Sequence, residues 1–426
     1  MDPIEFLLSL EVLGMKFGLE NMRRLCSALD HPELAFRSVL VAGTNGKGSV
    51  TAMVSAALYA SGRRVGRYTS PHLLRLEERF VIDETEVDTA DLRAAAGQVQ
   101  RAVQTLLDRG ELEGPPTFFE CTTATAFELF RRAGVDIAVL EVGLGGRLDA
   151  TNVVTPVAAA ITSIDVDHQA QLGSTIAAIA REKSGIVKPG VPVVVGPLPQ
   201  EADAVVAETC QEHGAPLIRI GRDVSVEAAL RDGLTFVSIA TTSRRLRNVR
   251  LALTGRHQAS NAAVAVALLD QLSRVGLEIE DEAVVTGLSA ARWPARLERL
   301  RWRNCDVLLD AAHNPAGARA LADYLREARW SDVTLVFGAM RDKDVSGMLK
   351  ELLPLCAVVI CTTAQSPRAM RSTELGEISV ELAGSTVRVE TIPEPRVALA
   401  RACELERSVV AAGSIFLIGP LRDILR

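Results

Sequence analysis

The chain has 426 residues, enough for two or three domains, and the 48% hydrophobic and 23% charged residues are the balance of an ordinary globular protein. A net charge of -6 argues against nucleic acid as a main partner, because phosphate backbones are bound by basic surfaces. Seven cysteines without a C-x-x-C pair, no basic leader and no apolar run of about 18 residues predict a cytoplasmic protein without a membrane partner.

Apolar, strand-like runs alternate with helical patterns through the first part of the chain. Strands are expected at residues 38–42, 136–142, 157–164 and 191–195. Helices are expected from Ser49, over 122–132 and over 174–184, with Ser174 capping the start of the last and Gly185 ending it. This alternation predicts parallel strands that are covered by helices on both faces.

The pattern changes twice in the second part of the chain. Two β-rich runs within residues 234–253 flank a polar turn and predict an antiparallel hairpin, followed by a helix over 260–275. A second alternating series begins after residues 293–296. Its strands are expected at 306–309, 333–337, 358–362 and 414–418, and its helices at 316–327 and 345–353. We therefore predict an α/β protein with a larger domain at 1–295 and a smaller α/β domain at 296–426.

The segment SVLVAGTNGKGSV, from residue 38, reads as a strand, a glycine-containing loop and the start of a helix. Such a loop can present backbone N–H groups and a helix N-terminus to a phosphate. Lys47 can reach the outer phosphates, and Ser49 can face a magnesium ion or a phosphate oxygen. Because Val41 replaces the first glycine of the usual pattern and Gly48 follows the lysine, a tight turn with an incidental lysine is the alternative. We favour a nucleotide site, since all its parts occur in the required order.

Three polar residues follow the later strands. Glu141 ends the strand at 136–142, at the edge where α/β proteins bind ligands, and can hold magnesium or act as a capping carboxylate. His168 can be a metal ligand or a loop histidine, and Lys183 can be an ordinary surface lysine. A P-loop nucleotide switch stays open on these residues, although the Asn-Lys dipeptide of a guanine-reading element is absent from the sequence.

Taken together, the motifs resemble the folylpolyglutamate synthase/dihydrofolate synthase family of the Mur-type ligases. The matching segments, in family order over nearly the whole chain, are residues 17–21 (FGLEN), 42–49 (AGTNGKGS), 68–73 (YTSPHL), 117–120 (TFFE), 140–152 (LEVGLGGRLDATN), 165–173 (DVDHQAQLG), 182–186 (EKSGI), 293–296 (WPAR) and 310–315 (DAAHNP). Ala295 and Ala311 stand where glycine is common, and Ser184 where alanine is common. None of these departures removes a chemically active group.

The resemblance implies a Mur-type ATP-binding domain, with a mostly parallel sheet and a small antiparallel region, and a Rossmann-like C-terminal domain. It implies an ATP-dependent ligase, in which ATP phosphorylates a carboxylate of a pterin substrate and the amino group of L-glutamate attacks the acyl phosphate. Magnesium and lysine then offset the repulsion between the acid and the ATP phosphates. The implied small-molecule partners are ATP, Mg²⁺, dihydropteroate, tetrahydrofolate and L-glutamate.

The stretch RLDATN at residues 147–152 resembles bacterial members that carry out both reactions, so we favour a bifunctional enzyme acting as a monomer. Folylpolyglutamate synthesis alone, or a P-loop regulatory protein, are the alternatives. A cell-wall Mur ligase is disfavoured, because those chains commonly carry a further N-terminal domain before the phosphate loop.

The resemblance also assigns site residues. The phosphate-binding residues are Asn45, Gly46, Lys47, Gly48 and Ser49. The magnesium ligands are Ser70, Glu141 and His168, and Lys183 matches a lysine that carries a carbamate. The contacts to the base and ribose of ATP are Asn261, Arg296 and Asp310, so ATP is expected to touch both domains. The catalytic residues are Lys47, Lys183 and His313, and the pterin contacts are Thr117, Leu148, Asp149, Ala150 and the loop at 17–21.

Overall fold

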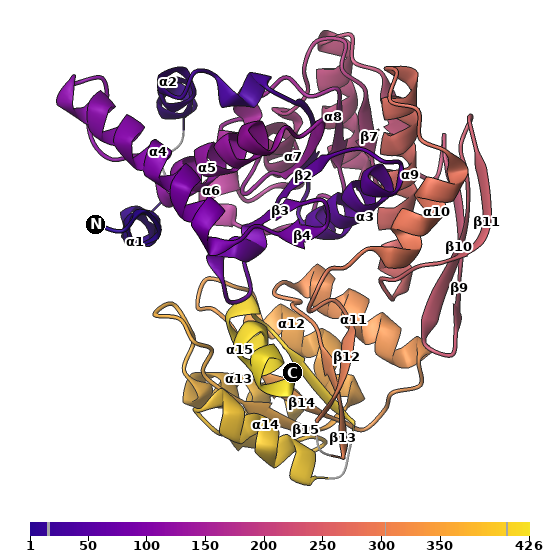
Figure 1. Ribbon diagram of the computed structural model, residues 1–426. Coiled ribbons are helices and arrows are strands. Elements are labelled where there is room, and N and C mark those ends of the chain that lie inside the picture. The colour runs from indigo at the N-terminus through magenta and orange to yellow at the C-terminus, as the bar shows by residue number, and fades with distance from the viewer. Residues whose placement is uncertain (15–17, 303, 406–407) are drawn as a thin grey trace. The chain divides into compact units, whose positions relative to one another are not determined.

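The computed structural model describes residues 1–14, 18–302, 304–405 and 408–426 (Figure 1). The chain divides into two compact units. Unit 1 comprises Met1–Glu227, Val237–Val249 and Ser260–Ala291, and unit 2 comprises Ala228–Phe236, Arg250–Ala259 and Arg292–Arg426. Two short stretches that precede the predicted boundary at residue 295 therefore belong to unit 2.

A large, mostly parallel sheet forms the centre of unit 1. Among the described residues its eight strands are β1 (Arg37–Ala42), β2 (Val65–Tyr68), β3 (Phe80–Ile82), β4 (Thr85–Glu86), β5 (Ile137–Glu141), β6 (Ala158–Ile161), β7 (Val193–Val195) and β8 (Leu217–Arg219), in the order β4-β3-β2-β5-β1-β6-β7-β8. At one edge, β3 pairs in the antiparallel sense with both β2 and β4. All residues of β5 and β6 are buried, so both faces of the sheet are covered. This confirms the predicted fold class.

The helices of unit 1 are α1 (Pro3–Ser9), α2 (Glu20–Ala28), α3 (Lys47–Ala60), α4 (Thr89–Asp108), α5 (Phe118–Ala133), α6 (Gln169–Leu172), α7 (Ile176–Ser184), α8 (Gln200–Glu212), α9 (Arg256–Arg274, whose first turn belongs to unit 2) and α10 (Asp281–Ala290). Helices α3 and α5 pack against the large sheet, and α10 packs on α3 and α4 on α5. The predicted Ser174 cap is wrong, because the side chain of Thr175 accepts the N–H of Ala178 and begins α7. Helices α3 and α10 approach closely, since a Cβ on Gly287 would lie 2.4 Å from the backbone of Ala57.

A separate three-stranded sheet contains the predicted hairpin. Its strands are β9 (Ser225–Arg231), β10 (Leu234–Ala240) and β11 (Arg245–Arg250), in the order β11-β10-β9. The N–H of Thr241 donates to the carbonyl of Arg244, and the N–H of Leu251 donates to the carbonyl of Thr235, so β10 and β11 run in opposite directions. The sequence analysis missed β9, whose SVEAALR pattern lacks a run of β-branched residues.

Unit 2 has its own sheet and core. Its strands in the described residues are β12 (Glu298–Trp302), β13 (Cys305–Leu309), β14 (Val333–Phe337), β15 (Cys356–Cys361), β16 (Arg388–Thr391) and β17 (Val409–Ala412), in the order β12-β13-β17-β14-β15-β16. Its helices are α11 (Pro315–Glu327), α12 (Val345–Leu352), α13 (Ser372–Ala383), α14 (Pro395–Glu404) and α15 (Ile415–Leu425). Leu308, Leu335 and Phe337 are fully buried in a core that is distinct from that of unit 1.

The predicted strand at 414–418 is wrong. These residues begin α15, where the Ser414 side chain accepts the N–H of Phe416, and the strand is β17 just before them. A short apolar run does not distinguish a buried strand from a buried helix. In the described part of the chain, none of the helices has both the length and the apolar character required to cross a bilayer.

Candidate active site

The loop between β1 and α3 has a backbone and surroundings that require glycine. Gly43 has φ 149° and Gly46 has φ 86°, in the region that side chains disfavour. A Cβ on Gly43 would lie 2.0 Å from Oγ1 of Thr162, and one on Gly46 would lie 2.4 Å from Oδ1 of Asn261. The loop therefore packs directly against the segment after β6 and against α9, which places the predicted ATP ligand Asn261 beside Gly46.

Hydrogen bonds fix the same loop to the chain that follows β6. The N–H of Asn45 donates to Oγ of Ser163 at 2.9 Å. Oγ1 of Thr44 accepts the N–H of Asp165 at 3.0 Å and donates to the carbonyl of Asp165 at 3.2 Å. The sequence analysis did not assign this role to Thr44 and Ser163, because the bonds join segments far apart in the chain. These hydrogen bonds tie the phosphate loop to the segment that follows β6.

Two lysines converge on one carbonyl of this loop. Nζ of Lys47 donates to the carbonyl of Gly43 at 3.0 Å and to that of Thr44 at 3.1 Å. Nζ of Lys183, from α7, donates to the same Gly43 carbonyl at 3.0 Å. The ammonium of Lys47 at this point attracts an anion such as a triphosphate. Gly48 and Ser49 are in the first turn of α3, and Ser49 is buried.

Lys183 is a buried residue, so the surface-lysine interpretation is wrong. Its exposed fraction is 4%. Burial, followed by the charge of Lys47, lowers the pKa of Lys183 to about 7, although Asp167, Asp149 and Asp165 act in the opposite direction. A large part of the Lys183 population is therefore a neutral amine near pH 7, which is the form that reacts with an electrophile such as CO₂.

Two predicted magnesium ligands meet at the same edge of the sheet. Glu141 is the last residue of β5 and pairs with Val41 of β1, next to the phosphate loop. Its exposed fraction is 4%, and its Oε2 accepts the N–H of Ser70 at 3.2 Å. His168 follows β6, with a half-exposed side chain whose Nε2 lies 4.0 Å from Oδ1 of Asp167. The oxygen atoms of Ser70 and Glu141 suit magnesium.

The described residues contain no group of three or more His, Cys, Asp or Glu that could hold a metal on their own.

The predicted pterin contacts have structural partners of their own. Oγ1 of Thr117 accepts the N–H of Glu120, whose carboxylate accepts the N–H of Thr117, so the two form a capping box at the start of α5. Asp149 is buried and accepts the N–H groups of Leu144 and Thr151, and burial raises its pKa. Ala150 is buried beside it.

The other predicted pterin contacts are Leu148 and the loop at residues 17–21. Leu148 is partly exposed, and Phe17, at the start of the predicted 17–21 loop, lies outside the described residues.

The remaining predicted residues lie in unit 2. Asp310 follows β13, and its carboxylate accepts the N–H groups of Leu297 and Ala312 at 2.9 and 2.8 Å. Burial raises the pKa of Asp310, while the nearby charge of Arg296 opposes the rise, so these two predicted ATP contacts are neighbours. Nδ1 of His313 lies 2.9 Å from the carbonyl of Ala311, a contact that orders their shared loop.

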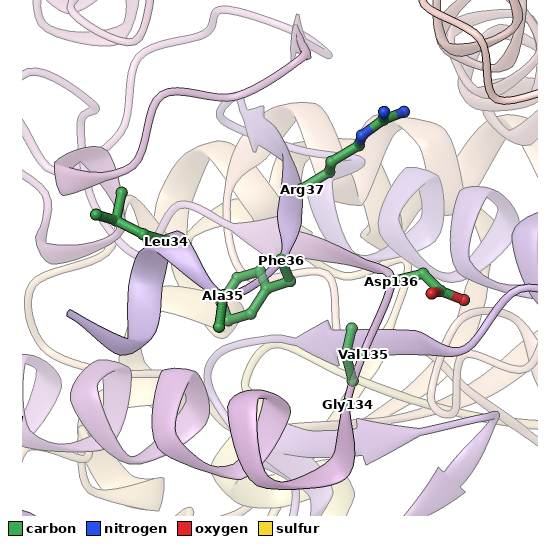
Figure 2. A pocket seen from close by; sticks show the side chains of 7 residues that line it. All are labelled: Leu34, Ala35, Phe36, Arg37, Gly134, Val135 and Asp136. Atoms are coloured by element: carbon green, nitrogen blue, oxygen red, sulfur yellow. The ribbon is translucent and has the colours of Figure 1, made fainter. Parts of the chain in front are cut away.

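A surface depression of about 490 Å³ lies elsewhere on unit 1 (Figure 2). It is lined by Leu34, Ala35, Phe36, Arg37, Gly134, Val135 and Asp136. These residues immediately precede or begin β1 and β5, so the depression lies at the amino ends of the strands. The phosphate loop and Glu141 are at the carboxyl ends, where ligands of parallel α/β sheets bind, so this depression is not part of the candidate site.

Comparison with known proteins identifies two family domains in this chain. Residues 41–269 match the Mur ligase middle domain, and residues 295–415 match the Mur ligase glutamate ligase domain. The fold and the site thus define a Mur ligase.

Individual relatives show which family of Mur ligases the chain resembles. The chain is 37% identical to the dihydrofolate synthase/folylpolyglutamate synthase of Bacillus subtilis over 86% of its own length and 85% of that relative. It is 36% identical to a probable bifunctional folylpolyglutamate synthase/dihydropteroate synthase of Haloferax volcanii, over 99% of this chain but only about half (50%) of that longer protein. The crystallised folylpolyglutamate synthase of Mycobacterium tuberculosis, complexed with ADP, superposes with a TM-score of 0.92 at 34% identity, covering 100% of this chain and 99% of that one. The chain belongs to the folylpolyglutamate synthase/dihydrofolate synthase family of ATP-dependent ligases.

Proposed function

We propose that this chain adds L-glutamate to dihydropteroate and to the γ-carboxylate of tetrahydrofolate, with ATP as the source of energy. The observation that carries the proposal is the convergence of Lys47 and Lys183 on the Gly43 carbonyl, at the sheet edge where Glu141 ends β5. Family membership supports the same reaction, and the Bacillus relative bears both activities in its name.

The reaction needs an activated acid, because hydroxide is a poor leaving group. A carboxylate oxygen of the pterin acid attacks the γ-phosphorus of ATP, and the bond from that phosphorus to ADP breaks. The glutamate amine, after losing a proton, attacks the acyl carbon, and phosphate leaves as the amide forms. Lys47 and the N–H groups of the phosphate loop stabilise the charge on the transferred phosphoryl group.

The metal and the modified lysine belong to this proposal. Ser70, Glu141 and His168 would hold magnesium, which neutralises phosphate charge when it is bound. The neutral amine of Lys183 would bond to the carbon of CO₂ and release a proton, and the carbamate formed would be an anion able to hold a cation. The pKa of Lys183, about 7, supports the availability of the neutral amine.

The other assignments are also proposals. Thr117, Leu148, Asp149 and Ala150 would contact the pterin. Asn261, Arg296 and Asp310 would contact the nucleoside of ATP, with His313 acting near the phosphates. The predicted location is the cytoplasm, and the predicted oligomeric state is a monomer. Light scattering of the purified chain measures its mass and so tests the oligomeric state.

One assay separates the candidate functions. The chain is incubated with ATP, magnesium and glutamate, and with either dihydropteroate or tetrahydrofolate, and both the amide product and phosphate are measured. We expect equal amounts of amide and phosphate with each acid, and little phosphate when either the acid or glutamate is omitted. Product from tetrahydrofolate alone would restrict the chain to folylpolyglutamate synthesis. Phosphate release that is independent of acid and glutamate would instead support a regulatory nucleotide-binding protein.

A further inference from the structure

Arg79 is a buried cation whose surroundings differ from those of the other buried arginines. In the described part of the chain the buried arginines are Arg67, Arg79 and Arg244. Arg67 pairs with Glu84 at 3.0 Å, and Arg244 pairs with Asp270 and Asp281. Within the described residues, no carboxylate lies within ion-pair distance of Arg79. A buried charge without a counter-charge is unfavourable to folding.

The groups that contact Arg79 are neutral. It ends a short 3₁₀ helix at Leu76–Arg79, and its Nε donates to Nδ1 of His72 at 2.9 Å. That nitrogen is an acceptor and therefore carries no proton. The Cζ atom of Arg79 lies 4.9 Å from the centroid of the Phe118 ring, and the Tyr68 hydroxyl is beside it. An aromatic face and a histidine nitrogen orient the guanidinium without neutralising its charge.

Two carboxylates act on Arg79 only from a longer distance. Glu11 is exposed to solvent, and Glu141 is engaged with the N–H of Ser70. The guanidinium fork is thus held in place for an anion that the described residues do not supply. Bidentate pairing with a carboxylate is the interaction that this planar group forms best.

The position of Arg79 indicates which anion it would receive. Phe118 directly follows Thr117, a proposed pterin contact, and His72 lies two residues after Ser70, a proposed magnesium ligand. The charges of Arg79 and Asp149 both act on the hydroxyl of Tyr68, so Tyr68 lies near each of them. In the proposed reaction, the acid must extend from the pterin contacts toward the phosphate loop.

We propose that Arg79 binds the reacting carboxylate of the pterin acid and positions it for phosphorylation. This inference rests on the proposed function. Arg79 pairs with the carboxylate anion, so the acid is bound in preference to a neutral analogue such as its carboxamide, which would leave the buried guanidinium unpaired. Arg79 is thereby a substrate-binding residue that selects the ionised acid.

Binding measurements on the full chain test this without requiring turnover. Isothermal calorimetry compares pteroic acid with its carboxamide, in the presence of ADP and magnesium, for wild type and for Arg79→Met. We expect wild type to prefer the acid, and Arg79→Met to lose about 30-fold or more in affinity for the acid while its affinity for the carboxamide and for ADP is unchanged. Arg79→Lys keeps the positive charge but lacks the planar guanidinium, so we expect it to recover part of the affinity for the acid. If Arg79→Met does not fold, Arg79→Lys takes its place in the comparison of acid with carboxamide.

Arg67→Met is the matched control, because it removes another buried arginine from the same unit. It breaks the ion pair with Glu84, so we expect a lower unfolding midpoint but an unchanged preference for acid over carboxamide. Equal losses for acid and carboxamide in Arg79→Met, or an unchanged ratio, would show a purely structural arginine and overturn the inference. If wild type binds neither compound while still binding ADP, the proposed function fails, and the inference fails with it.

Discussion

The carbonyl oxygen of Gly43 accepts hydrogen bonds from Lys47 and Lys183, two residues that are far apart in the sequence. Burial, followed by the charge of Lys47, makes the ammonium form of Lys183 less favourable. The ammonium of Lys47 therefore attracts a triphosphate to the loop and also favours the neutral form of Lys183.

The low pKa of Lys183 makes stability depend on pH. The folded chain releases this proton near pH 7, whereas the unfolded chain holds it until about pH 10.5. Between these values the unfolded state binds more protons, so the free energy of unfolding rises with pH, by up to about 1.4 kcal/mol per pH unit. In CO₂-free buffer, we expect Lys183→Met to lack this component of the rise from pH 7 to pH 9 in urea unfolding.

Lys350→Met is the control for that measurement, because Lys350 is exposed on α12. We expect the free energy of unfolding of Lys350→Met to change with pH in the same way as that of wild type. If the free energy of unfolding of Lys183→Met also changes with pH in that way, Lys183 has an ordinary pKa and the buried-amine argument is wrong.

Residues differ in how well the sequence predicts their place in the structure. The places of Lys47 and Glu141 in the fold could be predicted, because Lys47 follows a glycine loop and Glu141 ends an apolar strand. Arg79 could not, since it lies in the charged run LEERF, where an arginine reads as surface charge. Its burial depends on His72 and Phe118, and long-range packing of this kind leaves no periodic signal in the chain.

At the scale of elements, helix α3 joins the phosphate loop at one end and a turn at the other. Gly46 precedes α3 and Gly62 follows it, with φ values of 86° and 79°. A Cβ on Gly46 would collide with Asn261, whereas nothing lies within 4 Å of a Cβ on Gly62. The two glycines therefore share a backbone conformation but differ in their neighbours.

This pair gives a prediction with an internal control. Gly46→Ala and Gly62→Ala should each destabilise the chain by about 1–2 kcal/mol through the left-handed backbone. Only Gly46→Ala displaces the Asn261 side chain, so we expect it alone to weaken ADP binding, by about tenfold or more. Thermal unfolding and calorimetric titration with ADP measure the two effects. Equal ADP affinities in both variants would contradict the assigned loop.

The sequence predicted the elements well where hydrophobic periodicity was strong. The strand at 333–337 matches β14, and the strand at 38–42 differs from β1 by one residue. Edge strands such as β12 and β16 were missed, because they span only five and four residues, none of them fully buried. At 414–418 the side chain of Ser414 caps the start of a helix. The sequence analysis overlooked this cap because the residues after it form an apolar run.

At the scale of the whole molecule, the two units are interleaved along the chain. Unit 2 takes residues 228–236 and 250–259 from within the sequence of unit 1. Leu230 packs against the core of unit 2, and Arg256 forms an ion pair with Glu327 at 2.7 Å. The predicted boundary at residue 295 could not show this, because the segments are short and lie before the break in pattern.

Because the two units are interleaved, we expect the stability of unit 2 to depend on residues 228–236 and 250–259. A fragment consisting of residues 292–426 lacks both, so we expect the amides of Val333–Phe337 to exchange at least about tenfold faster than in the full chain. Hydrogen exchange with mass spectrometry measures the rates. Arg256→Met in the full chain should have little effect, because its ion pair is largely exposed. Unchanged exchange in the fragment would show that unit 2 is independent of the two segments.

The close packing of α3 against α10 also limits how the sequence can vary. A Cβ on Gly287 would lie 2.4 Å from the backbone N and Cα of Ala57, so a larger residue at position 287 must push α3, and with it the phosphate loop, away from α10. Every residue at position 57 carries these two backbone atoms, so no substitution there makes room. Selection on the nucleotide site is thus expected to extend to α10 and to appear as a glycine retained at position 287 among homologues.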